Sequence, residues 1–585
     1  MKNFFKTVMA NIVAIFIVGF IGMIGLFLFI LISSMSGKGS VNVKDNSVLT
    51  INLKDNIIES TSELSSSIFD LGNDSSLKIS DILNAIKQAK DDKKISGISI
   101  ETDGTTAGIT QIDDIRKALE DFKKSGKFVY AYGNNVSQSS YYLSTVADQY
   151  YLNPTGGVEL KGLSTEVVFF KDLFDKYGIG ADVIRHGKYK SAVEPYLTNK
   201  ISDENKEQLS FLLNDLWGNI SKKIETSRKL SAEELKTTTD SLYGIIPEYA
   251  LKSKLVDKLL QKSEYDNLIK GKLKVAAKDD LNKVSIGNYI EYVNKNASSS
   301  SAKDQVAVLY ASGEIFNGKG NTGIYSENFI KEIKKIEKND NVKAVVLRIN
   351  SPGGSANASD EILFELQQLK AKKPLVVSFG DYAASGGYYI AMAGQKIFSE
   401  ANTLTGSIGV FGLVMNFKEL ANRNGLRSDV VATNVNSKMF STISGMTPGT
   451  RNMMQKSVEQ TYKRFVYFVT QNRKKTFEEI DAIGGGHVWS GTRAKELGLV
   501  DEIGTLDDAV KYAAGLAKTK DFNIKNYPKD KSNFEKFFES MNEEDVAAKA
   551  IETKFGKENY QLFQKINNPN NKGVQMALPY VLKIE

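Results

Sequence analysis

Ser385 lies in the stretch DYAASGGYY (381–389), between two alanines and two glycines that give its hydroxyl little cover. A serine hydroxyl is a weak nucleophile until a neighbouring base takes its proton. Histidine is the most frequent base, but the 585 residues include only His186 and His487. Cysteine is absent, which excludes a thiol nucleophile, disulfides and thiolate metal sites. The chemistry of Ser385 therefore depends on another base.

A second small-residue motif, NSPGG (350–354), follows the strand-like run AVVLRIN. Pro352 stiffens this turn, and the two glycines let a ligand approach the backbone closely. The amides of Gly353 and Gly354 are candidates to stabilise an oxyanion during acyl transfer, where one donor contributes about 3–4 kcal/mol. Ordinary strand-to-helix turns have the same composition, so this motif gains its meaning only together with AASGGY.

The chain from about residue 45 onward consists of two related copies. The strand-like runs 47–60, 95–103 and 127–133 in the first copy recur as 305–318, 342–350 and 374–380 in the second. The blocks FKDLFDKYGIGADV (170–183) and FKELANRNGLRSDV (417–430) match at an offset of 247 residues. Several blocks in the same order indicate an internal duplication. We predict two tandem α/β domains, 45–295 and 305–585, separated by a serine-rich linker, 296–304.

The two copies have lost complementary parts of what looks like one site. Ser385 falls opposite Gln138, and NSPGG has no glycine-rich counterpart in the first copy. Conversely, Lys190 of the first copy falls opposite Ser437 of the second. This pattern is expected if a single site is assembled from both halves, with a lysine as the base. A lysine can act so only when burial lowers its pKa by several units from about 10.4. Most lysines are solvated, and Lys188 is an equal candidate on position alone.

The N-terminal run 8–32 carries no charge and is long enough to span the roughly 30 Å hydrocarbon core of a bilayer. It exceeds the apolar stretch of about 7–15 residues that a cleaved signal peptide has. Lys2 and Lys6 precede the run, which favours a cytoplasmic N-terminus, although two lysines soon after it weaken this orientation. We predict a single-pass anchor within 1–35 in the cytoplasmic (inner) membrane. The bulk of the chain would lie on the outer, periplasmic side, and 8–32 would contact membrane lipid.

The net charge of +7 arises from lysines that are spread among acidic residues. No basic block of the kind that follows a phosphate backbone occurs, so we expect no nucleic-acid partner. No Walker-type loop occurs either, so we expect no nucleotide. Two distant histidines and no cysteine leave no obvious ligand set, so we expect no metal and no other cofactor.

Four motifs in order resemble signal peptide peptidase A, the long duplicated form, in peptidase family S49. The motifs are NSPGGSANAS (350–359), AASGGYY (383–389), LTGSIGVFG (404–412) and YKSAVEPY (189–196). The resemblance covers essentially the whole chain. It implies a membrane-anchored serine endopeptidase with two Clp protease/crotonase-like domains, which degrades cleaved signal peptides and other extended apolar peptides. It also implies a homotetramer that encloses the sites.

The resemblance also implies roles for individual residues. Ser385 would be the nucleophile, and Lys190 the general base, because the family's lysine immediately precedes SAVEP. Ser407 in TGSIG would help to orient the lysine. Gly354 and Gly353 would supply the oxyanion hole.

Other interpretations stay open on the sequence. A crotonase-type acyl-CoA enzyme also surrounds an oxyanion with backbone amides, but it needs no aligned serine and lysine. A catalytically inactive membrane scaffold of the same fold, or a binding module, would not need all four motifs. We expect His487 to be structural, and His186, four residues before Lys190, to be a bystander or a modulator of the lysine. The tail from about Asp521 suggests no function.

Overall fold

The computed structural model describes residues 6–7, 9–11, 13–22, 25, 41–60, 76–296, 302–529 and 574–578. The predicted membrane span 8–32 lies partly outside these residues, and its residues 13–22 are helical. In the described part of the chain, no helix is both long enough and apolar enough to cross a membrane.

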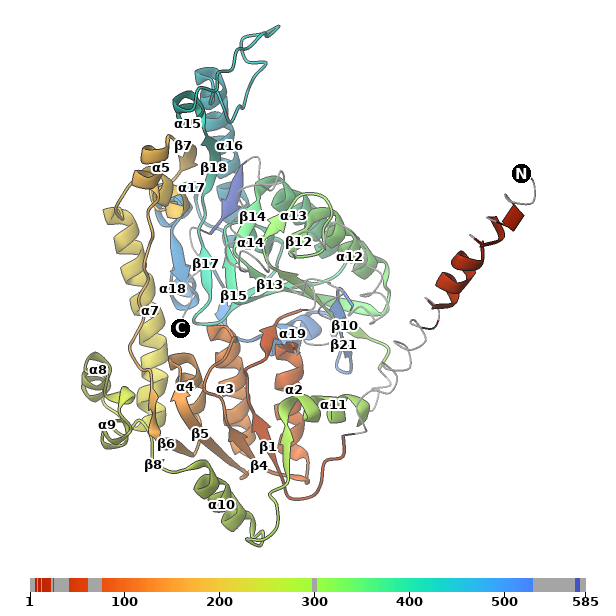
Figure 1. Ribbon diagram of the computed structural model, residues 1–585, viewed down its shortest axis with the longest axis vertical. Helices are drawn as coiled ribbons and strands as arrows, with labels where there is room; N and C mark the ends of the chain where they lie inside the picture. Colours follow the sequence, from red (N-terminus) through yellow and green to blue (C-terminus); the bar gives the residue numbers. More distant parts are fainter. Residues whose placement is uncertain are drawn as a thin grey trace.

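Two mainly parallel sheets, one from each half, form the centre of the molecule (Figure 1). The first sheet runs β8 (Lys258–Leu259), β6 (Gln149–Val158), β5 (Phe128–Val136), β4 (Ile95–Ile100), β1 (Ser47–Ile51), β9 (Lys283–Ser285). The strand order of the second sheet is β19 (Val488–Ser490), β17 (Leu404–Gly406), β15 (Leu375–Ala384), β13 (Val342–Ser351), β10 (Gln305–Ser312), β21 (Asn523–Tyr527). Off this path, β16 (Ile397–Ser399) pairs with β15 and with β20 (Glu502–Ile503). The matching orders β5-β4-β1-β9 and β15-β13-β10-β21 confirm the predicted duplication.

Helices pack around both sheets. Those of the first half are α2 (Ile79–Asp91), α3 (Ile109–Lys123), α4 (Gln138–Ser144), α5 (Lys171–Tyr177), α6 (Glu194–Leu197), α7 (Asp203–Arg228), α8 (Ala232–Asp240), α9 (Pro247–Lys252), α10 (Lys262–Leu273) and α11 (Ile286–Asn296). Those of the second are α12 (Ser326–Lys338), α13 (Ala356–Lys370), α14 (Gly386–Ala391), α15 (Lys418–Arg423), α16 (Pro448–Arg473), α17 (Phe477–Ile483), α18 (Gly491–Glu496) and α19 (Leu506–Leu516). Short 3-10 turns occupy Ser191–Val193 and Tyr243–Ile245.

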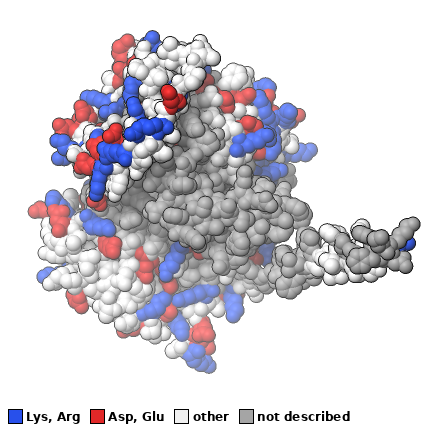
Figure 2. Space-filling model, turned by 45° about the horizontal axis from the view of Figure 1, so that its top comes forward, with Lys and Arg blue, Asp and Glu red and all other residues white. Residues whose placement is uncertain are grey.

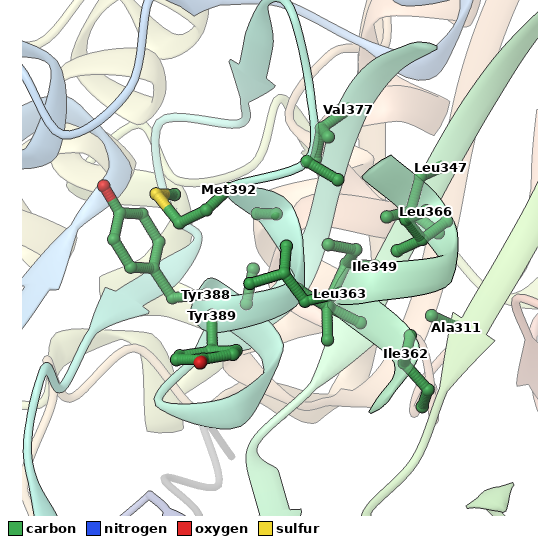
Figure 3. Close-up of a cluster of buried hydrophobic side chains, with 14 of the residues drawn as sticks. Ala311, Leu347, Ile349, Ile362, Leu363, Leu366, Val377, Tyr388, Tyr389 and Met392 are labelled. Atoms are coloured by element: carbon green, nitrogen blue, oxygen red, sulfur yellow. The ribbon is translucent and has the colours of Figure 1, made fainter. Parts of the chain in front are cut away.

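The core of the second half explains why its central strands read as continuous apolar runs. Strand β13 is buried on both faces, as parallel strands covered by helices are. On one face, Leu347 and Ile349 pack against Leu363 and Leu366 of α13, and Tyr388 and Met392 complete the cluster (Figure 3). This packing holds the C-terminal end of β15 in place, and Ser385 is the next residue after that end.

Helix α7 runs beside both halves (Figure 1). Ser202 caps its start by accepting a hydrogen bond from the Asn205 N–H at 3.2 Å. Leu212 and Leu216 pack in a cluster with residues of the second half, whereas Ile220 packs in the core of the first. One helix therefore ties the two halves together.

A third sheet combines segments from both halves. Its order is β12 (Ile324–Tyr325), β11 (Ile315–Phe316), β14 (Gly353–Ser355), β22 (Gln575–Ala577), β18 (Val410–Asn416), β7 (Gly180–His186). A separate pair consists of β2 (Asn56–Ile58) and β3 (Ser76–Lys78). Strand β7 comes from the first half and pairs antiparallel with β18 of the second along its full length.

Buried polar groups also cross between the halves. Arg348 donates from Nε and Nη2 to the two carboxylate oxygens of Glu59, each at 3.0 Å, and both side chains are at most 1% exposed. Asp381 accepts hydrogen bonds from the backbone N–H and the hydroxyl of Thr110. Figure 2 shows one face of the molecule. Over the described part of this face, lysines and arginines are interspersed with acidic residues. Buried polar contacts therefore join the two halves.

Candidate active site

Ser385 stands in the turn between β15 and α14. Its φ of 54° and ψ of −114° are unusual for a residue that carries a Cβ. The turn is held because the Ser385 N–H donates to the Gly406 carbonyl at 2.9 Å, and its own carbonyl accepts from the Tyr389 N–H at 2.8 Å. A Cβ on Gly386 would lie 2.7 Å from the Ser359 hydroxyl, so the close packing requires the glycine. The small residues of AASGG thus fix an irregular turn that presents one hydroxyl.

Lys190 reaches this turn through the pairing of β7 with β18. The register places His186, the last residue of β7, opposite Val410, the first of β18. Lys190 follows β7 by four residues, and Ser407 precedes β18 by three. Because the two strands are antiparallel, both residues leave the ladder at the same end. The site is consequently built from both halves of one chain.

The three side chains meet at the lysine amine. Lys190 Nζ lies 3.0 Å from Ser385 Oγ, 2.8 Å from Ser407 Oγ and 3.2 Å from the Ser407 carbonyl oxygen. All three residues are 0% exposed. Burial lowers the pKa of Lys190 well below its ordinary value, because an ammonium loses its hydration there. A neutral amine in this position can accept the proton of the Ser385 hydroxyl.

Two glycines that the sequence interpretation did not single out make room for the lysine. A Cβ on Gly486, whose φ is 89°, would lie 2.6 Å from the Lys190 nitrogen. A Cβ on Gly409 would lie 3.2 Å from Lys190 Cδ. The run GGG (484–486) was the available signal, since successive glycines indicate a close backbone approach.

Buried polar side chains hold the loop that carries the lysine. The Gln208 amide donates to the Tyr189 carbonyl at 3.4 Å, and its oxygen accepts from the Val488 N–H at 2.9 Å. Glu194, in the SAVEP motif, accepts hydrogen bonds from the Ser202 hydroxyl and the Asn205 amide. These contacts anchor both sides of Lys190 to helix α7.

The two predicted oxyanion glycines differ in their surroundings. The Gly353 N–H donates to the Ser351 hydroxyl at 3.2 Å, so this amide already has a partner. A Cβ on Gly353 would lie 2.7 Å from the Gly386 nitrogen, which shows that NSPGG and AASGG meet in space. The N–H of Gly354 is in strand β14, which pairs with β22. Gly353 thus lies against the turn that carries Ser385, and Gly354 lies in the ladder with β22, opposite Met576.

The rival basic groups stand in other environments. Lys188 is exposed, and its Nζ lies 4.9 Å from the centre of the Tyr189 ring. His487 stacks on Trp489 with 3.6 Å between ring centres, and burial lowers its pKa to about 4. His186 stacks on Tyr462 at 3.8 Å. Across the described residues, no group of three or more histidine, aspartate or glutamate side chains is arranged to hold a metal ion.

We predict that Ser407→Ala will lower kcat for peptide hydrolysis by about 10- to 100-fold with little change in KM. The substitution removes the hydroxyl at 2.8 Å from Lys190 Nζ, while the Ser407 carbonyl still contacts the amine. Steady-state kinetics on an apolar peptide check the prediction. The matched control is Ser399→Ala, which removes an equally buried hydroxyl that bonds the Glu400 carbonyl. Equal losses in both variants would contradict an orienting role for Ser407.

Comparisons with known proteins agree with this architecture. The model of the family described as "Peptidase family S49" matches residues 121–276 and 367–520, one segment in each half. The Clp protease family model matches residues 297–405.

Similar proteins extend over most of the chain. "Protease 4" of Salmonella typhi is 38% identical over 473 residues, which cover 79% of this chain and 75% of that protein. "Protease 4" of Haemophilus influenzae is 32% identical over 537 residues, covering 87% and 86%. "Serine protease SPPA, chloroplastic" of Arabidopsis thaliana is 29% identical over 478 residues, covering 80% and 69%.

The duplicated α/β fold and these relatives define the class of the protein as a protease with two tandem Clp protease-like domains. Within that class, the chain belongs to peptidase family S49.

Proposed function

We propose that the protein is a serine endopeptidase in which Ser385 is the nucleophile and Lys190 the general base. The observation that carries the proposal is the 3.0 Å approach of a fully buried lysine amine to the hydroxyl of Ser385. Burial favours the neutral amine, which is the form that takes a proton. A serine–lysine pair of this kind requires no histidine.

The proposed reaction has two halves. Ser385 Oγ attacks the carbonyl carbon of the scissile bond while its proton passes to Lys190 Nζ. The Gly354 N–H stabilises the resulting oxyanion, and collapse expels the new amine, which takes the proton from Lys190. Water then attacks the acyl-enzyme, with Lys190 again as the base, and releases the carboxylate product. Ser407 keeps the amine directed at Ser385 throughout.

Extended apolar peptides, including cleaved signal peptides, are the proposed substrates. Support comes from the family to which the chain belongs. Backbone pairing along a strand would bind such peptides with little dependence on their side chains. Membrane anchoring through 8–32, with the catalytic part on the outer side, and assembly into a homotetramer stay predictions from the sequence.

We expect hydrolysis of a fluorogenic apolar peptide whose kcat/KM rises with pH. Below the lowered pKa of Lys190 the amine is protonated and cannot act as the base, so activity should fall about tenfold per pH unit there. Above that pKa the amine is neutral and the rate should level off. The midpoint should lie well below the ordinary lysine value of about 10.4. Rates measured between about pH 5 and 10 check this.

Two results would count against the proposal. A rate that does not depend on pH over this range would exclude Lys190 as the titrating base. No turnover of any peptide would favour an inactive scaffold or an acyl-CoA enzyme instead.

A further inference from the structure

Gln208 lies on helix α7, which runs beside both halves of the molecule (Figure 1). The residue carries a polar amide, yet it is 0% exposed. Burying such a group is unfavourable unless its hydrogen bonds are satisfied. The partners of the Gln208 amide therefore explain its presence at this position.

The oxygen of the amide bonds to the second half. Gln208 Oε1 accepts a hydrogen bond from the Val488 N–H at 2.9 Å. The other polar atom of the same peptide group, the His487 carbonyl oxygen, accepts a hydrogen bond from the Ser407 N–H at 2.7 Å. One peptide group therefore links Gln208 to the backbone of the residue that is proposed to orient the lysine.

The nitrogen of the amide bonds to the lysine loop (residues 187–191). Gln208 Nε2 lies 3.4 Å from the Tyr189 carbonyl oxygen and 3.4 Å from Ser191 Oγ. These two residues stand on either side of Lys190. Each contact is at the long end for a hydrogen bond, but together they hold the loop just before and just after the lysine.

The partners of the amide fix its orientation. A backbone N–H only donates, so Val488 must face the oxygen, and a backbone carbonyl only accepts, so Tyr189 must face the nitrogen. Asn205 Oδ1 is a further acceptor, 3.3 Å from Gln208 Nε2. Asn205 is itself oriented, because its amide nitrogen donates to the Glu194 carboxylate at 3.1 Å. A side chain with only donors or only acceptors could not bond to both segments.

These contacts form a closed circuit through the proposed catalytic groups. The side chains of Lys190 and Ser407 meet at 2.8 Å, and the Ser407 backbone bonds to the 487–488 peptide group. That peptide group bonds to Gln208, which returns to the lysine loop. The lysine loop belongs to the first half, whereas Ser407 and the 487–488 peptide group belong to the second. Gln208 thus joins the two halves at the point where both contribute to the site.

We propose that Gln208 is a positioning residue for the proposed reaction: it fixes the lysine loop relative to Ser407, so that the Lys190 amine stays buried. The inference rests on the proposed function, in which this amine is the base for Ser385. A misplacement of about 1 Å can lower a rate about 100-fold. An amine that gains water also regains its preference for the protonated form. Loss of Gln208 should therefore change both the rate and the pH at which the base titrates.

The ionisable groups beside the lysine loop leave burial as the main influence on the base. Burial is the cause that lowers the pKa of the lysine. Arg185 donates to the lysine's own carbonyl at 3.4 Å and lies 3.9 Å from Glu194. Burial also lowers the pKa of both His186 and His487, so both are mainly neutral at pH 7. Lys188 is exposed. A neutral substitution in the circuit therefore reports on the burial of the amine.

Gln208→Met removes the amide, keeps the length of the side chain and changes no charge. We expect kcat for hydrolysis of a fluorogenic apolar peptide to fall about 10- to 100-fold, with KM within about threefold of the wild type. The midpoint of the pH–rate profile should rise by about one unit or more, because the lysine amine gains water. Rates of the full-length chain, purified in detergent, between about pH 5 and 10 measure these quantities.

Gln208→Glu is a second variant that fills the same volume. It keeps an acceptor for the Val488 N–H, but its carboxylate has no donor for the lysine loop. Its negative charge also favours the protonated amine, so the midpoint should again rise by about one unit or more. This variant tests the role even if Gln208→Met does not fold.

Gln138→Met is the matched control. Gln138 is also a buried amide, 2% exposed, and it makes three hydrogen bonds with the backbone of Lys161 and Gly162 within the first half. Its replacement should lower stability, but it should leave the midpoint unchanged and kcat within about threefold of the wild type. Thermal unfolding followed by circular dichroism shows that each variant is folded.

The outcomes separate this inference from the proposed function. A fall in kcat with an unchanged midpoint in the Gln208 variants would show a purely structural role and overturn the inference, while the peptidase proposal stands. An equal shift of the midpoint in Gln138→Met would overturn it as well. If the wild type hydrolyses no peptide, the proposed function is wrong, and the inference fails with it.

Discussion

Replacing Ser385 by alanine, or Lys190 by methionine, should lower kcat/KM for hydrolysis of an apolar peptide by about 10⁴-fold or more. The first change removes the attacking oxygen, and the second removes the amine 3.0 Å from it. Methionine is chosen because the lysine chain is fully buried, so an apolar side chain of similar length preserves the packing. Initial rates with a fluorogenic peptide, after circular dichroism has shown an unchanged fold, check this prediction.

Lys188→Ala is the matched control, since Lys188 is exposed and only two residues away. Its rate should stay within about twofold of the wild type. The double variant of Ser385 and Lys190 should be no slower than either single variant, because residues that act as one unit are not additive. Substantial activity in the Lys190 variant, or a loss in Lys188→Ala, would mean that the base has been assigned wrongly.

Arg348→Met should lower the free energy of unfolding by about 3–5 kcal/mol, because it leaves the Glu59 carboxylate buried without its guanidinium partner. Arg348 also faces the buried carboxyls of Asp114 and Glu400, whose pKa values burial raises. Urea denaturation followed by tryptophan fluorescence measures the loss. Trp217 and Trp489, which pack against the cores of the first and second halves, report on both.

Two further variants show whether the loss of stability comes from the buried Arg348–Glu59 pair or from the removal of any charge. The double variant Arg348→Met with Glu59→Leu should recover much of the stability, because apolar groups often replace a buried ion pair without loss. Lys295→Met, which breaks an exposed pair with Glu291, should cost less than about 1 kcal/mol. If the two single losses are equal, the pair between the halves is not a main source of stability.

The sequence was informative wherever the signal is local. Runs such as AVVLRI predicted buried parallel strands, and the corresponding β13 is buried on both faces. The small residues around Ser385 predicted an accessible turn. The structure has a turn there with an unusual backbone conformation, but Ser385 itself is buried, so the prediction of accessibility was wrong for this structure. The loss of Ser385 from one copy and of Lys190 from the other predicted a shared site. The structure brings these two residues together.

What the sequence left open depends on contacts between distant segments. Position alone did not separate Lys190 from Lys188, because the two differ in burial, and burial is set by the pairing of β7 with β18. The space that Gly409 and Gly486 leave for the lysine exists only once three loops meet. The buried pair of Arg348 and Glu59 joins residues 289 positions apart.

Strand β22 shows most clearly which features the sequence determines and which depend on the tertiary structure. By itself, the sequence determined the duplicated fold, the candidate Ser385 and the two candidate lysines. These features depend on periodicity, small-residue turns and internal repeats, which can be recognised in short stretches of sequence. Nothing in the sequence of β22, QMA, marks it as a strand that pairs with Gly354, since other short apolar segments can pair with a free edge as well. Only the tertiary structure decided which strand edges pair with β22 and that Met576 stands opposite Gly354, because strand register and burial arise when the segments pack.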